Sequence, residues 1–137
     1  MSQESSRQIQ FFIQWKELGN WQESLPEKNT FTAHNPLCGD LISLHCLPEN
    51  QSYEVVAMHG EACSVCMASA AILYNRREKW NLESLNSYEA SLEEFLNDNG
   101  KLEGYPLEEI NFWEIMKSNP GRHRCAFLPF HALKKAF

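Results

Sequence analysis

The period of the apolar residues changes along the chain, and this feature limits the possible folds more than any other. Residues 5–19 carry apolar side chains at helical spacing, whereas residues 30–58 alternate with a period of two. From residue 64 onward the spacing is helical again. Strands grouped in one part of a chain and helices in another are typical of α+β folds. We therefore expect a small three-stranded antiparallel sheet with helices packed on one face.

The strands are joined by short links, which favour an antiparallel meander. They are expected at residues 30–33, 41–47 and 53–58, with residues 48–52 as a tight connection. Ile42, Leu44 and Cys46 alternate with polar residues, so the second strand is expected to be half-buried.

Helices follow the strands to the end of the chain. They are expected at residues 64–77, 82–98, 107–117 and 126–136. Asn99 and Gly100 form the expected stop of the second of these helices. Pro129 lacks a backbone N–H, so we expect it to delay the start of the last helix. The length of 137 residues is typical of one domain, residues 1–137.

Composition excludes several classes of protein. The formal net charge of −6 argues against nucleic acid as the main partner. The most apolar stretch, residues 62–74, is too short and too interrupted by serine to cross a membrane. The segment from Met1 to Arg7 lacks the apolar region of a secretory signal. The sequence therefore predicts an acidic, cytoplasmic protein without nucleic-acid or membrane partners.

The five cysteines do not fit a disulfide framework, because their number is odd and no secretory signal is visible. Three of them fall at junctions between expected elements: Cys38 after the first strand, Cys63 before the helix at residue 64, and Cys125 before the last helix. Free backbone N–H groups and the helix dipole stabilise thiolate at such positions. Thiolate is the form that binds metal or attacks sulfur, so metal or thiol chemistry is expected here.

A carboxylate accompanies the first of these cysteines. Asp40 follows Cys38 by two residues, and Gly39 between them permits a tight bend of the backbone. The side chains of Cys38 and Asp40 are therefore expected to face one centre.

Three motifs follow one another along the chain. They are Asn35-Pro-Leu-Cys-Gly-Asp40, Gly60-Glu-Ala-Cys-Ser-Val-Cys-Met-Ala-Ser69 and Arg122-His-Arg-Cys-Ala126. In this order they resemble the U-type iron–sulfur cluster assembly family (IscU, SufU and the N-terminal domain of NifU), with its Cys-Gly-Asp turn, its cysteine before an Ala/Ser-rich helix and its late cysteine. The resemblance covers residues 30–137. Arg122, Arg124 in place of a histidine, and the long interval before the last cysteine resemble the SufU type most.

For a SufU-type protein the resemblance implies a zinc ion held by Cys38, Asp40, Cys63 and Cys125. It also implies that a partner cysteine desulfurase passes persulfide sulfur to Cys38, so any enzymatic role is that of an accessory sulfurtransferase. Three thiolates and a carboxylate carry more negative charge than Zn²⁺ neutralises. Arg122 and Arg124 are placed to offset the excess.

Two other functions remain open at this stage. The same ligands suit a scaffold that assembles a [2Fe–2S] cluster, or binds iron, and passes the cluster to acceptor apoproteins, because a carboxylate is a replaceable ligand among thiolates. The chain also fits a zinc-stabilised interaction module that has lost sulfur chemistry. The basis is its N-terminal segment, residues 9–21, which differs from the Tyr-rich docking helix of the family.

The remaining cysteines and one histidine have simpler explanations. Cys66 forms a Cys-x-x-Cys motif with Cys63, but no βαβ pattern surrounds it, so we expect a packing residue rather than a redox pair. Cys46 is expected to be buried in its strand. His123 lies beside the third motif, where it is a candidate to assist proton or sulfur transfer. The aromatic N-terminal helix is expected to pack in the core, with docking as a second role.

Overall fold

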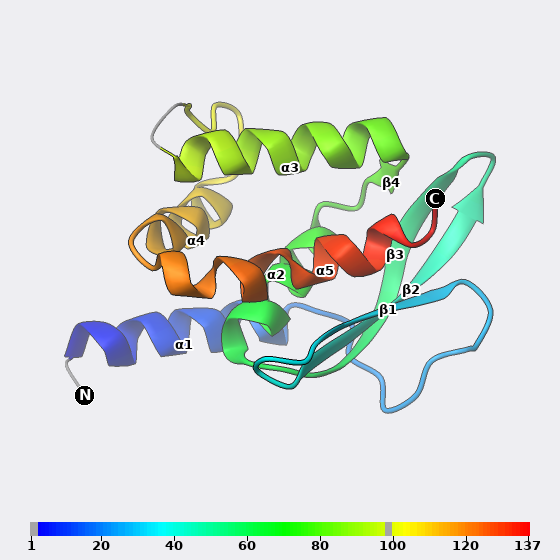
Figure 1. Ribbon diagram of the computed structural model, residues 1–137, viewed down its shortest axis with the longest axis horizontal. Helices are drawn as coiled ribbons and strands as arrows, with labels where there is room; N and C mark the ends of the chain where they lie inside the picture. Colours follow the sequence, from blue (N-terminus) through cyan, green and yellow to red (C-terminus); the bar gives the residue numbers. More distant parts are fainter. Residues whose placement is uncertain (1–2, 98–99) are drawn as a thin grey trace.

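The computed structural model describes residues 3–97 and 100–137 (Figure 1). The helices are α1 (Gln3–Glu17), α2 (Ser64–Asn75), α3 (Leu82–Leu96), α4 (Leu107–Lys117) and α5 (His123–Lys134), with a short 3₁₀ helix at Pro120–Arg122. The strands are β1 (Thr30–Asn35), β2 (Asp40–Glu49), β3 (Ser52–Glu61) and β4 (Lys79–Trp80). The α+β class is confirmed.

Within the described residues the sheet has one strand more than expected. Its order is β1-β2-β3-β4, and every pair of neighbours is antiparallel. In β4, Lys79 and Trp80 pair with Glu54 and Tyr53 of β3. A strand of two residues is too short to show an alternating pattern, so the periodicity did not reveal it.

The register of the meander decides which residues meet at one end of the sheet. Asn35 pairs with Asp40 across the β1–β2 turn, and Leu41 pairs with Glu61 at the end of β3. The start of β2 therefore lies beside both the β1–β2 turn and the residues that lead into α2. The three cysteine motifs gather at this end.

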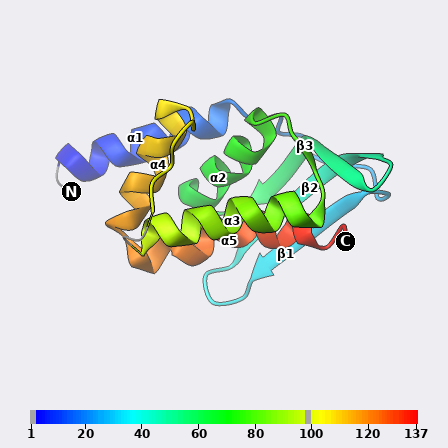
Figure 2. The same cartoon turned by 90° about the horizontal axis from the view of Figure 1, so that it is seen from above.

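Two helices, α2 and α5, lie against the sheet, and the others form outer layers (Figures 1 and 2). α2 contacts β2 and β3, α5 contacts β1 and β2, and the two helices contact each other, so both cover the same face. The two helices approach closely, as shown by the hydrogen bond that Ser69 of α2 donates to the Ala126 carbonyl of α5 (2.5 Å). α1 packs against α2, while α3 runs alongside α5 and contacts α4.

The N-terminal helix contributes to the core as expected. Phe12 and Trp15 of α1 are buried, and the Phe12 ring makes an edge contact with Phe112 of α4 (centroids 5.8 Å apart). Ile9 and Ile13, on another face of α1, are exposed. In the part of the chain that the structure describes, no helix has the length and apolarity required to cross a membrane.

The structure corrects the expected connection at residues 48–52. β2 continues through Pro48 to Glu49, and the turn consists of Asn50 and Gln51. Asn50 adopts a φ of 55°, a left-handed conformation that asparagine tolerates better than most residues. Pro48 is accepted because it lies near the end of the strand, where a missing N–H disturbs the ladder little.

The boundaries of α1, α2, α3 and α5 also differ from expectation, by two or three residues. α5 begins at His123, so Cys125 is its third residue and Pro129 lies inside the helix instead of delaying its start. Pro129 removes one helical hydrogen bond, to the Cys125 carbonyl, and the burial of most of α5 compensates for this loss. α3 reaches Leu96; its predicted end at residue 98 and the stop at Asn99 lie outside the described residues.

Candidate metal centre

The turn between β1 and β2 presents Cys38. The Gly39 N–H donates to the Asn35 carbonyl (2.8 Å), and the Leu37 N–H donates to the Asn35 side chain (3.1 Å). Gly39 has a φ of 76°, which glycine adopts without strain. The tight bend expected at Gly39 is confirmed, and it leaves Cys38 exposed.

Asp40 is held at the start of α2. It is the first residue of β2 and only 5% exposed, and its Oδ1 accepts a hydrogen bond from the backbone N–H of Cys63 (2.9 Å). Cys63 is the N-cap of α2, where free N–H groups and the helix dipole favour a negative charge. Local spacing did not predict this contact, because the register of β2 with β3 creates it.

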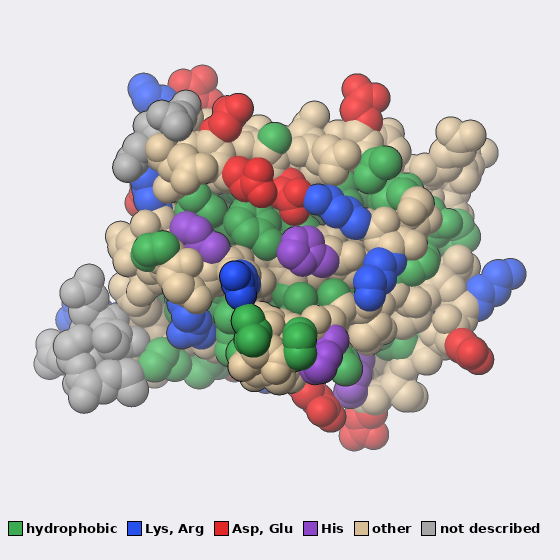
Figure 3. All heavy atoms as spheres, in the orientation of Figure 1, with side chains coloured by type: hydrophobic (Ala, Val, Ile, Leu, Met, Phe, Trp, Pro, Cys, Tyr) green, Lys and Arg blue, Asp and Glu red, His purple; other side chains and the backbone are tan. Residues whose placement is uncertain are grey.

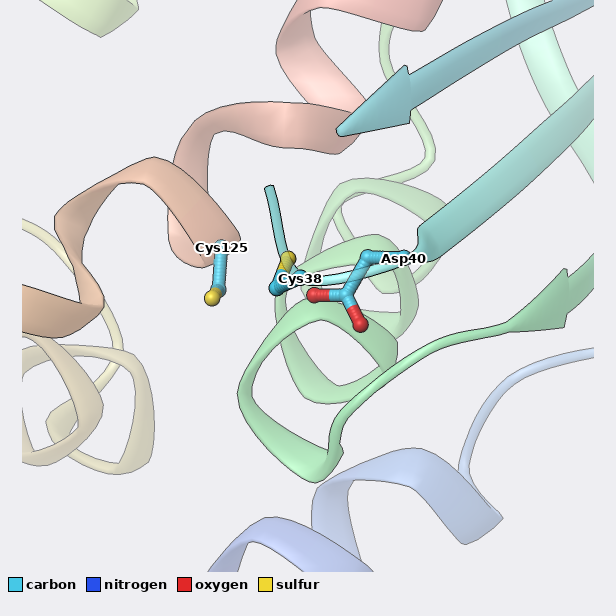
Figure 4. Close-up of side chains that lie close together, drawn as sticks. All are labelled: Cys38, Asp40 and Cys125. Carbon is cyan, nitrogen blue, oxygen red and sulfur yellow. The ribbon is translucent and has the colours of Figure 1, made fainter. Parts of the chain in front are cut away.

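Three of the expected ligands come together. One ligand atom each from Cys38, Asp40 and Cys125 lies within 4.8 Å of the other two. Figure 4 shows these side chains side by side, from the β1–β2 turn, the start of β2 and the first turn of α5. Sulfurs on a tetrahedral zinc ion, with Zn–S bonds of about 2.3 Å, lie about 3.8 Å apart. The three side chains are therefore near enough for small rotations to bring their ligand atoms onto one ion.

The Asp40 side chain provides a test of whether the site fits a metal. Its Oδ2 is buried and has no hydrogen-bond partner in the structure. A buried carboxylate oxygen without a partner is costly unless a cation or another group satisfies it. Two cysteine sulfurs within reach of this oxygen form a donor set that suits zinc or iron. The residues fit a thiophilic metal ion.

Cys63 is near the group but not part of it. Among the described residues, the group with all ligand atoms within 4.8 Å contains Cys38, Asp40 and Cys125. The Cys63 backbone N–H donates to Asp40 Oδ1, and the Cys63 thiol contributes to the raised pKa of Cys125. Rotation about its χ1 moves the sulfur without moving the backbone, so Cys63 stays a predicted ligand.

Burial and neighbouring charges set the protonation state of Cys125 in the metal-free protein. The pKa of its thiol is raised to about 12, first by burial and then by neighbouring acidic groups, of which Cys63 contributes most. Cys125 is therefore protonated at neutral pH in the metal-free protein. A bound divalent cation reverses this preference, because it deprotonates a coordinating thiol.

Arg122 lies against two of the sulfurs. Partial burial lowers the pKa of its guanidinium, but hydrogen bonds and charge interactions with Cys63 and Cys125 outweigh this effect and raise the pKa above its ordinary value. This agrees with the expected role of Arg122 in balancing thiolate charge, which stays a prediction.

Arg124 and His123 line a groove of about 380 Å³ between α3 and α5. Figure 3 shows this face, where acidic side chains lie next to histidine and basic ones. The His123 Nε2 donates to the Met116 carbonyl (2.6 Å), so this histidine ties α5 to α4. The expected roles of Arg124 in charge balance and of His123 in proton transfer stay predictions.

The two remaining cysteines are fully buried. Cys46 and Cys66 are both 0% exposed, which confirms the packing interpretation of each. Burial raises the pKa of Cys46 to about 12. For Cys66, burial and the charges of neighbouring acidic groups raise the pKa as well.

Known proteins resemble this chain in sequence and in fold. No protein-family model matches the chain. Among curated proteins, it is similar to the zinc-dependent sulfurtransferase SufU of Bacillus subtilis (strain 168), with 28% identity over 102 residues. The match covers 74% of this chain and 69% of that protein.

Solved structures share the fold over nearly the whole chain. A putative iron–sulfur cluster assembly scaffold protein for the SUF system from Fervidobacterium islandicum AW-1 superposes with a TM-score of 0.72 at 20% identity, covering 95% of this chain and 97% of that one. The N-terminal part of a nitrogen-fixing NifU-like protein from Brucella abortus gives a TM-score of 0.74 at 16% identity, covering 94% and 92%. In its sequence match to SufU, its fold and the three cysteine motifs at one end of that fold, the chain is similar to the SufU/NifU/IscU-type iron–sulfur cluster assembly proteins.

Proposed function

We propose that the protein is a zinc-dependent acceptor of persulfide sulfur from a cysteine desulfurase. The observation that carries the proposal is the gathering of Cys38 and Cys125 around Asp40, whose Oδ2 is buried without a partner. In this proposal Cys63 supplies the fourth ligand. The similarity to a zinc-dependent sulfurtransferase supports zinc as the metal.

Cys38 is the proposed sulfur acceptor because of its exposure. It lies open on the β1–β2 turn, whereas Cys63 is half-buried and Cys125 is 9% exposed. A persulfide on a partner protein reaches Cys38 without any opening of the fold. Leu37 beside it is 79% exposed and offers apolar contact to that partner.

The chemistry is a thiol–persulfide exchange. Zinc, when bound, keeps its cysteine ligands deprotonated at neutral pH. The Cys38 thiolate attacks the outer sulfur of the partner's persulfide, a new S–S bond forms at Cys38, and the partner's cysteine leaves as thiolate. Asp40, fixed by the Cys63 N–H, and Arg122, beside Cys63 and Cys125, keep their places and hold the local charge balanced.

The test is the turnover of a co-expressed cysteine desulfurase with and without this protein. We expect stimulation by the wild type and none by Cys38→Ala, with about one zinc per chain that is lost in Cys63→Ala. Cys46→Ala is the matched control, because this cysteine is buried away from the site, and it should stimulate like the wild type. A wild type that leaves turnover unchanged would contradict the proposal.

A scaffold for a [2Fe–2S] cluster is the second candidate. It is favoured by the combination of an exposed Cys38 with an oxygen ligand, Asp40, since both permit a cluster to leave. Anaerobic reconstitution with iron and sulfide should then give charge-transfer absorption in the visible range, more persistent in Asp40→Ala. A protein that stays colourless after reconstitution would rule out this role.

A further inference from the structure

β1 has a free edge, and this edge leads directly to the turn that carries Cys38. β1 is the first strand in the order β1-β2-β3-β4, and among the residues that the structure describes no strand pairs with its outer side. The outer side of β3 differs, because it pairs with β4 and, at Met58, with the segment at Trp21. A free strand edge presents unpaired backbone N–H and C=O groups to another chain.

The register with β2 determines which backbone groups of β1 point outward. The Cys46 N–H donates to the Asn29 carbonyl (2.9 Å), just before β1 begins. In an antiparallel pair the residues that bond the neighbouring strand alternate with residues that point away from it. Thr32 belongs to the second set, and its carbonyl accepts a hydrogen bond from the Lys135 side chain. The residues of β1 with outward-pointing backbone groups are Thr30, Thr32 and His34.

Lys135 makes this edge unsuitable for a second copy of the chain. It is exposed, follows α5 directly and occupies the Thr32 carbonyl. A lysine at a strand edge is a common means of preventing edges from pairing with each other. Two copies paired through β1 would bring their Lys135 side chains to the same edge, where like charges repel. The occupant that suits this edge carries negative charge.

The surface beside the edge is basic, although the chain has a net charge of −6. Arg124, His131 and Lys135 are exposed and lie on one stripe of α5, because residues seven and eleven positions apart project from the same side of a helix. α5 lies against β1 (Figure 1), and neither residues 29–39 nor residues 115–137 contain Asp or Glu. Figure 3 shows basic and histidine side chains across the middle of this face.

The acidic side chains of the groove between α3 and α5 lie on the other side of this stripe. Glu89 and Glu93 of α3 line the groove together with Arg124 and His131. Glu89 is already paired with Lys134. The β1 side of the stripe therefore keeps an excess of positive charge.

We propose that the free edge of β1 binds an extended acidic segment of a partner protein, which adds to the sheet as a further strand. Its backbone bonds the outward groups of β1 and takes the Thr32 carbonyl from Lys135. Every second side chain of the segment points toward α5, where its carboxylates pair with the stripe from Lys135 to Arg124. The stripe is about 16 Å long, which matches about five residues of a strand.

This docking site goes beyond the proposed function, because it requires neither a metal ion nor sulfur transfer. Its position nevertheless serves that function. β1 ends at Asn35, just before the turn that carries Cys38, so a segment bound along β1 ends beside the exposed thiol. The partner is thereby held on the side of the molecule where Cys38 is open.

Binding of a model peptide tests the proposal. The probe is a blocked nonapeptide of alternating glutamate and threonine, and its control carries glutamine in place of each glutamate. In NMR titrations of the ¹⁵N-labelled full chain at low salt, the glutamate peptide should shift the amide signals of Thr30, Thr32 and His34. It should bind at least about tenfold more tightly than the glutamine peptide, because two or more ion pairs each contribute about threefold. Equal affinities, or unchanged signals, would overturn the proposal.

A pair of variants at Thr32 tests the addition of a strand. Thr32→Pro removes an N–H that points away from β2, so the ladder of the sheet stays intact while the edge loses a donor. Thr32→Val keeps this N–H, and both variants lose the same hydroxyl contact with Ser43 (2.6 Å). We expect the probe to bind Thr32→Val like the wild type and Thr32→Pro at least about tenfold more weakly. Circular dichroism establishes that each variant folds, and equal binding by the two folded variants would overturn the addition of a strand.

Charge variants and modified probes complete the test. Lys135→Glu should weaken binding at least about tenfold, whereas Lys101→Glu, which makes the same change in the connection between α3 and α4, should leave it unchanged. Equal weakening by the two lysine variants would overturn the site at β1. Two probes N-methylated at opposite sets of alternate residues should differ in affinity, since only one set faces β1, and this measurement holds even if Thr32→Pro does not fold. Equal affinities of these two probes would also overturn the proposal, whereas a protein without bound zinc would contradict only the proposed function.

Discussion

Two buried carboxylates, in different parts of the molecule, have opposite surroundings. Glu109 of α4 is 2% exposed, and its Oε1 accepts hydrogen bonds from the Arg76 guanidinium (2.6 Å) and from the Tyr88 hydroxyl. Asp40 is 5% exposed, but one of its oxygens has no partner. An unsatisfied buried charge is costly unless another group, such as a cation, satisfies it. The contrast agrees with a structural role for Glu109 and with the proposed role of Asp40 as a ligand.

The Glu109 cluster connects three helices. Arg76, just after α2, stacks over the rings of Tyr88 (4.3 Å) and Tyr105 (5.1 Å) and also pairs with Glu78 (2.9 Å). Tyr88 belongs to α3 and Glu109 to α4, so the cluster fixes both helices to the end of α2. Its contacts are made within the chain, whereas one oxygen of Asp40 has no partner there.

The largest effect should follow from breaking the Glu109 cluster. Arg76→Ala leaves Glu109 buried without its cation, and removal of one partner of a buried ion pair costs about 3–5 kcal/mol of unfolding free energy. Urea unfolding measures the loss. The control is Glu78→Gln, because Glu78 is 40% exposed and a pair at the surface contributes at most about 1 kcal/mol. Equal losses in the two variants would contradict the structural role of Glu109.

The next effect concerns the metal centre. Free zinc at 100 times its dissociation constant should raise the unfolding free energy by about 2.7 kcal/mol, because the proposed ligands are gathered at one place only in the folded protein. Arg76→Ala should gain the same amount, since the two clusters share no partner and their effects add. The unfolding free energy of Cys63→Ala should rise little when zinc is added, because this variant lacks a proposed ligand. Unfolding with zinc and with a chelator measures the difference, and a zinc effect that disappears in Arg76→Ala would show that the clusters are coupled.

The sequence predicted one of these clusters and not the other. The Cys-Gly-Asp turn is local, because Gly39 sets the bend that brings Cys38 and Asp40 together. Cys125 was expected beside them only from the resemblance to the U-type family. The hydrogen bond from Cys63 to Asp40 depends on strand register, which spacing does not reveal. The same limit applies more strongly to Arg76 and its partners.

Arg76 and Glu109 are separated by the whole of α3, and each looks like an ordinary surface charge in its helix. Only the packing of α3 and α4 brings them together. The sequence did not predict β4 or the position of Pro129 inside α5, for related reasons. Two residues give no period, and the burial of α5 outweighs the local preference of proline.

A smaller effect extends the comparison to the buried thiols. Burial raises the pKa of Cys46 to about 12 from 9.0, and no charged neighbour contributes to this shift. The folded state therefore keeps the proton between pH 9 and 12 while the unfolded state loses it. The stability that Cys46 provides is complete below pH 9 and falls as pH rises, by about 1.4 kcal/mol per pH unit. Urea unfolding of the metal-free protein from pH 8 to 11 gives the unfolding free energy at each pH. Above pH 9, this free energy should fall less steeply with pH in Cys46→Ala than in the wild type, by about 1.4 kcal/mol per pH unit. An unchanged slope would contradict the expected protonation.

The smallest effect is the change in unfolding free energy when each buried carboxylate is replaced by its amide. It is the most informative, because we expect opposite signs at Asp40 and Glu109. Asp40→Asn keeps an oxygen for the Cys63 N–H but removes an unpartnered buried charge, so the metal-free protein should become more stable by about 1 kcal/mol. Glu109→Gln makes the same chemical change, but this carboxylate is paired with Arg76. The substitution leaves the Arg76 guanidinium without its partner, so it should destabilise the protein. Urea unfolding in the presence of a chelator compares the two variants. Destabilisation by Asp40→Asn would mean that the chain itself satisfies this carboxylate, and that the site does not depend on a metal ion for its charge balance.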